Sequence, residues 1–297
     1  MIARAVTRSR SVALSLLAVL ALGLVLAPGA LADAVTPEAG GSPNADDIDS
    51  LYKIVLVIAA IIFLIVEGSL LYCLFKYKAR KGRVAAQIHG NTNLEIGWTV
   101  GAAVILVALA VVTFLKLGAI QTPPNSDSNA QVAGSGVLVA STDEPTPPDG
   151  RALRVCVTGR QYIWRFTYLG AAGSCKQTYG KPFSYEEMVA PAGTTVVLQI
   201  ESTDVAHSWW IPALGGKFDA LPGYTNYTWF KAPKPGVTYA GQCAELCGRN
   251  HADMTARVRV VSPDQYEAYI ANLKKEISSA NKDSETLRKQ LEKQGDL

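Results

Sequence analysis

The sequence predicts a two-helix transmembrane hairpin followed by an exported all-β domain. Two apolar runs, about 54–75 and 96–116, each reach the roughly 20 residues that a helix needs to cross a bilayer. From about residue 151, short segments rich in aromatic and β-branched residues alternate with glycine and proline turns. Strands at this spacing, without helices between them, are typical of a sandwich or barrel.

The first 32 residues have the pattern of a cleaved secretory signal. Three arginines precede an apolar run at residues 12–27, and Ala30-Leu31-Ala32 is a small-x-small cleavage site. An uncleaved membrane anchor is the alternative, but the run is short for a span and ends in Pro28-Gly29. Cleavage after Ala32 is therefore favoured, and the polar residues 33–50 form an exposed lead-in.

The loop between the two apolar runs sets the orientation of the hairpin, residues 51–118. Five lysines and arginines fall within residues 76–83, and such loops lie on the cytoplasmic side. The N-terminus and the β domain are then outside. Glu67 is the one charge in the first run, and a carboxyl packed at a helix face is favoured over an ion contact.

The remaining segments divide the exported part of the chain. Residues 119–150 have the proline, serine and asparagine content of a linker, and the β domain occupies residues 151–262. The charged segment 263–297 shows no strong apolar face and is expected to form a short helix that frays into a solvated tail. The net charge of +3 is too small to indicate a nucleic-acid partner.

Candidate metal ligands concentrate in one twelve-residue stretch, CAELCGRNHADM. It contains Cys243, Cys247, His251 and Met254, and a second histidine, His207, lies 36 residues before Cys243. Thiolate, imidazole and thioether are ligands that select copper over hard cations. The stretch therefore predicts a copper site closed by two loops at one end of the β domain.

Other interpretations of the two cysteines explain less. A disulfide leaves the neighbouring His and Met without a role, and a zinc site has no use for Met. A single-copper electron-transfer site uses one Cys, so the second thiolate indicates two metals that share bridging sulfurs. Two further cysteines, Cys156 and Cys175, flank a predicted hairpin, and whether they form a disulfide stays open because sequence does not give the geometry.

The stretch CAELCGRNHADM, with HSWWIPALGGKFDALPG at residues 207–223, resembles the dinuclear copper (CuA) segments of subunit II of cytochrome c oxidase. The resemblance covers about residues 50–262. It implies a bacterial plasma-membrane protein whose cupredoxin-like, Greek-key domain binds two copper ions on the outer side. It also implies that electrons pass from cytochrome c to a haem in subunit I, where oxygen becomes water, with coupled proton translocation. The implied partners are subunit I, further oxidase subunits, cytochrome c and membrane lipid.

The resemblance also implies roles for individual residues. It gives the copper ligands as His207, Cys243, Cys247, His251, Met254 and the backbone carbonyl of Glu245. The Glu245 side chain becomes a candidate ligand of magnesium at the interface with subunit I.

Two further sites follow from the same resemblance. Glu95, in the segment NLEIGWT, is a candidate for the mouth of a proton pathway. Tyr162 and Trp164 follow a Gly-x-Gln signature and are candidates for the ring at which electrons arrive; which of them serves stays open, because a tyrosine stands where better-known members have tryptophan.

Two alternatives differ from this hypothesis. A quinol oxidase subunit II shares the hairpin and the domain but lacks the copper ligands, which this chain retains. A membrane-tethered copper-binding or copper-delivery protein needs no polar residues in its anchor. Glu67 and Glu95 instead indicate packing against other helices, so the oxidase subunit is favoured.

Overall fold

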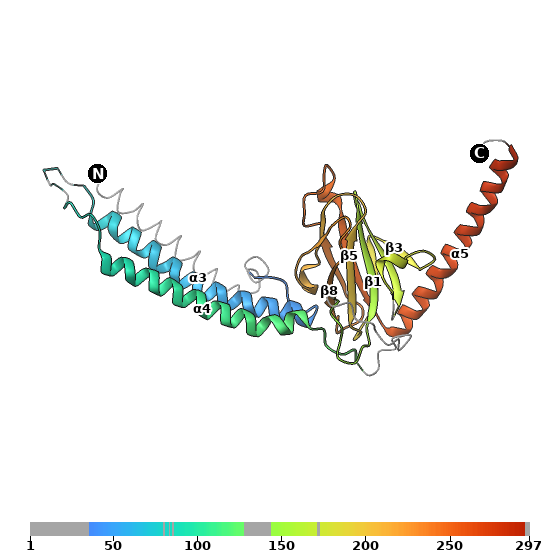
Figure 1. Ribbon diagram of the computed structural model, residues 1–297, viewed down its shortest axis with the longest axis horizontal. Helices are drawn as coiled ribbons and strands as arrows, with labels where there is room; N and C mark the ends of the chain where they lie inside the picture. The colour runs from blue at the N-terminus through green and yellow to red at the C-terminus, as the bar shows by residue number, and fades with distance from the viewer. Residues whose placement is uncertain are drawn as a thin grey trace, which may run out of the picture.

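The computed structural model describes residues 36–79, 81–82, 84, 86–127, 144–170 and 173–294. The predicted signal sequence, the middle of the predicted linker and the last three residues lie outside the described residues. Figure 1 shows a long helical hairpin, a β domain beside one end of it, and a last helix that extends away from the domain.

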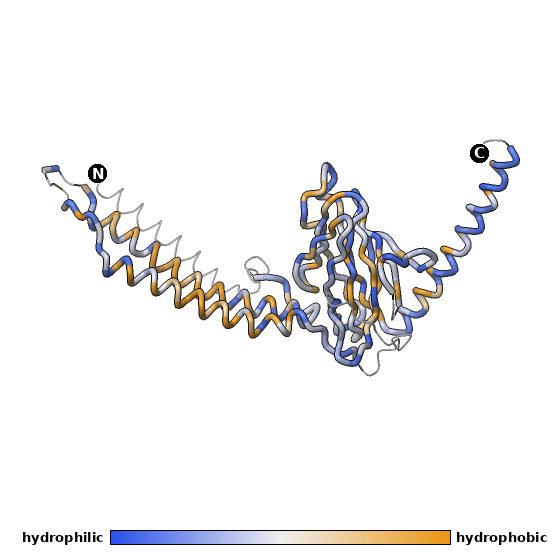
Figure 2. Tube along the Cα trace, in the orientation of Figure 1, coloured by the Kyte–Doolittle hydropathy of each residue, from blue (hydrophilic) through white to orange (hydrophobic). Residues whose placement is uncertain are grey.

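The hairpin consists of α3 (Pro43–Lys76) and α4 (Thr92–Gln121), which lie antiparallel and side by side (Figure 1). Both are long and apolar enough to cross a membrane, and Figure 2 shows the hydrophobic residues along their length. Each helix is longer than the predicted span. The additional turns of α3 come before residue 54, because they contact the β domain instead of lipid.

The start of α3 and the end of α4, which lie at the same end of the hairpin, are held to the β domain by hydrogen bonds. Asn44 Nδ2 donates to the carbonyl of Trp229 at 2.9 Å, and the backbone N–H of Lys231 donates to Ser42 Oγ at 3.0 Å. At the end of α4, Trp229 Nε1 donates to the carbonyl of Ile120 at 3.0 Å. One edge strand therefore contacts both helices and fixes the hairpin to the domain.

Within the described residues, ten strands build the β domain. They are β1 (Leu153–Arg160), β2 (Ile163–Gly170), β3 (Phe183–Tyr185), β4 (Glu187–Pro191), β5 (Val196–Ser202), β6 (His207–Trp209), β7 (Phe218–Ala220), β8 (Asn226–Phe230), β9 (Thr238–Gln242) and β10 (Thr255–Val261). One sheet has the order β3-β2-β1-β5-β8, a second has β4-β10-β9, and β6 pairs with β7. The predicted class, a helical hairpin followed by an all-β domain, is confirmed. The three-residue strands β3, β6 and β7 were not predicted, since they are too short to show alternation.

The core lies where alternate side chains of the sheets face inward, the period-2 pattern expected of strands. Val155 and Val157 on β1, and Val258 and Val260 on β10, are fully buried. The same apolar cluster contains both cysteines of the predicted copper stretch and its methionine. The predicted metal site therefore adjoins the core instead of lying on a free loop.

The C-terminal segment corrects one prediction. Residues Pro263–Gln294 form a single continuous helix, α5, of 32 residues, so the prediction of a short, fraying helix was wrong. An apolar face also exists at its start, formed by Tyr266, Tyr269, Ile270 and Leu273, which pack against the core. The sequence analysis missed this face because charged residues dominate the segment after Leu273, although these four residues recur at helical spacing.

Cys156 and Cys175 form a disulfide, with their Cα atoms 5.2 Å apart. The bond joins β1 to the segment that follows β2, across a sequence separation of 19 residues. It therefore constrains the unfolded chain in a loop of moderate length.

Replacing both Cys156 and Cys175 by alanine is expected to destabilise the β domain by about 3 kcal/mol, the cost of releasing a loop of this size. Denaturant unfolding of the full chain in detergent, followed by tryptophan fluorescence, measures this. Cys73→Ala changes an exposed thiol in α3 and serves as the control. An unchanged unfolding midpoint in the double variant under oxidising conditions would contradict the expectation.

Candidate metal centre

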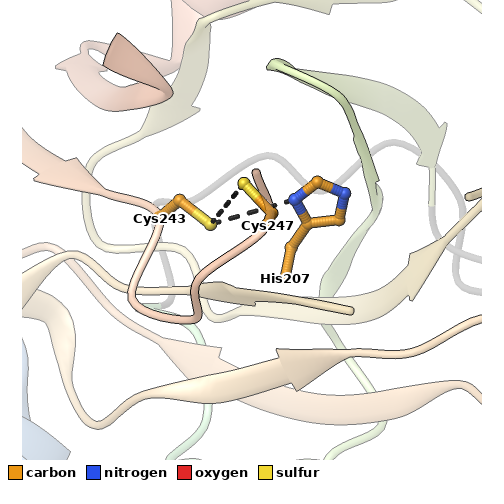
Figure 3. A group of neighbouring side chains, drawn as sticks. All are labelled: His207, Cys243 and Cys247. Atoms are coloured by element: carbon orange, nitrogen blue, oxygen red, sulfur yellow. Dashed lines mark hydrogen bonds between the residues drawn. The ribbon is translucent and has the colours of Figure 1, made fainter. Parts of the chain in front are cut away.

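The predicted ligands converge from two segments of the chain. His207 begins β6 and is fully buried, and its Nδ1 lies 3.9 Å from Cys243 Sγ. The sulfurs of Cys243 and Cys247 are also 3.9 Å apart. Figure 3 shows the imidazole and the two thiols directed toward one another.

The remaining predicted ligands lie on either side of this pair of sulfurs. Cys247 Sγ is 3.6 Å from His251 Nδ1 and 3.9 Å from Met254 Sδ. Cys243 Sγ is 3.3 Å from the carbonyl oxygen of Glu245. Each sulfur thus has one imidazole and one weaker donor as neighbours, so the structure brings all six predicted ligand residues together.

The geometry and chemistry of these donors fit two soft metal ions. Metal–thiolate bonds are about 2.3 Å long, so two sulfurs on one ion are at most about 4.6 Å apart. The observed 3.9 Å between the cysteine sulfurs meets that limit. Six donors exceed what one tetrahedral ion takes, and thiolate, imidazole and thioether favour copper. The residues present therefore fit a copper pair that shares both sulfurs.

Backbone hydrogen bonds fix the segment between β9 and β10. Cys243 N–H donates to the carbonyl of Met254 at 2.9 Å, which closes the segment on itself. Ala244 N–H donates to the carbonyl of Ser208 at 2.8 Å, which joins it to β6. Gly248 has φ +131°, and a Cβ there would lie 2.6 Å from the hydroxyl of Tyr162. A residue with a side chain would force this part of the segment away from the β1–β2 turn.

Asp204 orients His207 and was not predicted. His207 Nε2 and Asp204 Oδ1 are 2.9 Å apart, and Gln161 N–H donates to Asp204 Oδ2 at 2.8 Å. Partial burial alone would raise the pKa of Asp204, but hydrogen bonds from Gln161, His207 and Val205 lower it to about 2. The ionised carboxylate holds a proton on Nε2 and leaves Nδ1 free toward Cys243. The only signal in the sequence is an Asp three residues before the histidine.

The thiol of Cys247 is protonated at neutral pH when no metal is bound. Burial raises the pKa of Cys247 to about 11, and the neighbouring Cys243 adds to the shift. Since a metal binds the thiolate, metal binding at this site displaces protons.

Asp204→Asn is expected to weaken copper binding by about 10- to 100-fold, as is typical when the partner of a histidine ligand is lost. The amide must turn one N–H toward either His207 or Gln161, each of which now donates to the carboxylate. Competition with a copper chelator measures the affinity of the full chain. Asp283→Asn, at an exposed position of α5, is the control. Equal affinities for the wild type and Asp204→Asn would contradict this role.

The two candidate aromatic residues occupy different environments. Trp164 is fully buried, and its ring centroid is 5.9 Å from that of His207 in an edge-on contact. Tyr162 is only partly buried, and its hydroxyl accepts a hydrogen bond from Arg249 N–H at 3.1 Å. One ring therefore lies inside, against a candidate ligand. The other lies at the surface, against residues 243–254 between β9 and β10, called here the copper segment.

The two candidate carboxylates lie apart from each other. Glu95 is in the first turn of α4, at the end of the hairpin away from the β domain (Figure 1), so the structure does not bring it to the metal centre. The Glu245 side chain is exposed to solvent, while its carbonyl faces the sulfurs. Glu245 is thus available to a partner from the surface of the domain.

Comparisons with known proteins identify relatives of both the hairpin and the β domain. The model of the cytochrome C oxidase subunit II transmembrane domain matches residues 33–116, and that of its periplasmic domain matches residues 181–261. The chain is 31% identical over 270 residues to cytochrome c oxidase subunit 2 of Cereibacter sphaeroides, with 79% of this chain and 80% of that protein covered. It is 32% identical over 238 residues to the same subunit of Alkalihalophilus pseudofirmus. That match covers 79% of this chain but only 60% of that protein.

A solved structure, the periplasmic domain of subunit II of cytochrome oxidase of Bradyrhizobium japonicum, is 33% identical. It covers 42% of this chain and 96% of that one, with a TM-score of 0.38. The hairpin, the β domain and the family matches define the class as a membrane-bound component of a haem–copper oxidase. The chain belongs to the cytochrome c oxidase subunit II family, which confirms the resemblance seen in its sequence.

Proposed function

We propose that this subunit relays single electrons from cytochrome c to the haem of subunit I, where oxygen is reduced to water with coupled proton translocation. The observation that carries the proposal is the pair of buried sulfurs, Cys243 and Cys247, 3.9 Å apart with an imidazole beside each. Family membership supports the same function. The chain spans 60% of the length of one relative and 80% of another.

The protein's part in this function is to hold the donors in place. Cys243 and Cys247 would bridge two copper ions, with His207 and His251 as nitrogen ligands. The carbonyl of Glu245 and the thioether of Met254 would complete the set. Bound copper supplies reversible one-electron chemistry at this position. Burial of both sulfurs keeps water out, and the β framework limits the rearrangement of the ligands when the charge changes.

Electrons arrive, in this proposal, at the surface around Tyr162. This ring is partly exposed and contacts the copper segment at Arg249, while Trp164 is buried against His207. Leu246, between the two cysteines, is 76% exposed and offers apolar surface to a donor. We therefore assign the donor contact to Tyr162 and an internal packing role to Trp164.

The remaining assignments concern the rest of the complex. The exposed Glu245 side chain is proposed to contribute to a magnesium site with subunit I, since Mg²⁺ prefers carboxylate and water oxygens. Glu95 is proposed to lie at a proton pathway on the cytoplasmic side. Lys76 at the end of α3, with Lys78 and Lys81 in the loop that follows, supports this orientation, which places the β domain outside the cell.

Stopped-flow mixing of the copper-loaded full chain with reduced cytochrome c tests the proposal. The cytochrome is expected to become oxidised as the copper absorbance bleaches. Tyr162→Ala should slow this at least about fivefold, because truncating an aromatic anchor of an interface costs more than about 1 kcal/mol. Tyr179→Ala, at a fully exposed tyrosine beyond the far end of β2, should not. No electron transfer to the copper-loaded wild type would contradict the function.

A further inference from the structure

We propose that Gln161 is a positioning residue that couples the two ligand-bearing segments of the metal centre. The inference rests on the proposed copper site and assigns to it a residue outside its ligand set. Gln161 lies in the two-residue turn between β1 and β2, and its side chain and backbone each bond to a different segment.

The copper segment is joined to the rest of the domain by different contacts near Cys243 and near Cys247. Near Cys243, the backbone bond from Ala244 to Ser208 joins the copper segment directly to the strand of His207. Cys247 lies on the other side of the segment, beyond the reach of that ladder. Of the hydrogen bonds within the described residues, those that fix the backbone around Cys247 to another segment come from the β1–β2 turn.

Gln161 supplies the link on this second side. Its side-chain Nε2 donates to the carbonyl of Cys247 at 2.6 Å. Its backbone N–H donates to Asp204 Oδ2 at 2.8 Å, and Asp204 in turn holds His207 Nε2. One residue therefore connects the backbone of Cys247 on one segment with the imidazole of His207 on the other.

The turn that carries Gln161 is itself rigid. Arg160 pairs with Ile163 across the antiparallel ladder, so only two residues lie between the strands. The carbonyl of Gly159 accepts from Thr203 N–H at 3.2 Å, and the hydroxyl of Tyr162 accepts from Arg249 N–H. The turn thus provides a fixed point against which both ligand segments are set.

The side chain at this position has to be a hydrogen-bond donor. A glutamate of the same length presents only acceptor oxygens to the carbonyl of Cys247 at neutral pH. Two facing acceptors repel, so Cys247 loses its support while the chain keeps its shape. Because Gln161 is exposed, this replacement does not bury a charge.

Gln161→Glu in the full chain, loaded with Cu(II) in detergent, tests the inference. We expect copper to pass to a chelator about tenfold faster than from the wild type. This is the lower end of the range seen when a group that supports a metal ligand is removed. We also expect an altered electron paramagnetic resonance spectrum, since the position of one sulfur changes. Gln161→Met, which keeps the length and lacks the donor without adding charge, should behave in the same way.

Gln199→Glu is the matched control. Gln199 Nε2 donates to the carbonyl of Gly173 at 2.9 Å, so the same type of bond is lost at a buried position beside the disulfide. This variant should lower the unfolding temperature and leave copper retention and the spectrum unchanged. Wild-type retention and spectrum in both Gln161 variants would overturn the inference, as would equal changes in Gln161→Glu and Gln199→Glu.

The wild-type chain, measured first, separates this inference from the proposed function. A wild type without a two-copper spectrum would overturn the proposed function and the inference with it. A wild type with that spectrum, beside unaffected Gln161 variants, would overturn the positioning role alone.

Discussion

Cys247→Ser is expected to leave a folded chain that binds at most one copper ion. The sulfur of Cys247 lies within 3.9 Å of Cys243 Sγ, His251 Nδ1 and Met254 Sδ, so it belongs to both halves of the donor set. A serine hydroxyl is a hard donor with little tendency to lose its proton, and does not bridge soft ions.

The consequence for the assembled oxidase should be correspondingly large. Oxygen consumption with cytochrome c as donor should fall by more than about 100-fold. Loss of a residue that only supports a metal ligand costs up to about this much, and Cys247 is itself a proposed ligand. Circular dichroism should remain that of the wild type, since replacing one sulfur atom by oxygen removes little core volume. Cys73→Ser, at the exposed thiol of α3, is the control and should retain copper and activity. Two copper ions bound to Cys247→Ser would contradict the bridging role of this thiol.

Trp164→Ala is expected to cost about 3–5 kcal/mol of stability, the range for removing a buried tryptophan. The ring is fully buried in the core cluster that also contains both cysteines of the metal centre. It also contacts the ring of His207, with 5.9 Å between centroids. The cavity should therefore loosen a ligand as well as the core, and copper should be lost at a lower temperature.

Trp229→Ala separates these two effects. Trp229 is 2% exposed and packs in a smaller cluster with Ala152 and Val197, next to the membrane hairpin. Its removal should reduce stability to a similar degree and leave the copper spectrum of the folded protein unchanged. Unfolding temperature and spectrum are measured on the same samples. A normal spectrum in folded Trp164→Ala would contradict a role for this ring in holding His207.

The helical hairpin and the clustering of the candidate ligands could be predicted because most of their signals are local. A bilayer sets the length of an apolar run, which gave the two spans without knowledge of the fold. Cys243, Cys247, His251 and Met254 lie within one short stretch, so residue type and spacing alone pointed to a soft metal. The helix starts were less accurate, because the first turns of α3 are fixed by contact with the β domain.

The residues that support the ligands could not be predicted because their partners are distant in sequence. Gln161 meets Cys247 across 86 residues, and it meets Asp204 across 43. Neither pairing leaves a spacing pattern. The apolar start of α5, by contrast, could have been predicted, because Tyr266, Tyr269, Ile270 and Leu273 lie on one helix face by spacing alone. Only the fold shows that this face packs on the core. Whether Cys156 and Cys175 form a disulfide could not be predicted, because the distance between them depends on where the strands place them.

The copper content and the electron paramagnetic resonance spectrum of the wild-type full chain test the central claim most directly. An electron shared equally by two copper nuclei gives a seven-line hyperfine pattern, whereas one isolated copper nucleus gives four lines. The proposed site predicts two copper ions per chain and the seven-line pattern. One copper ion with a four-line spectrum would contradict it, and the chain would then be a single-copper or copper-delivery protein.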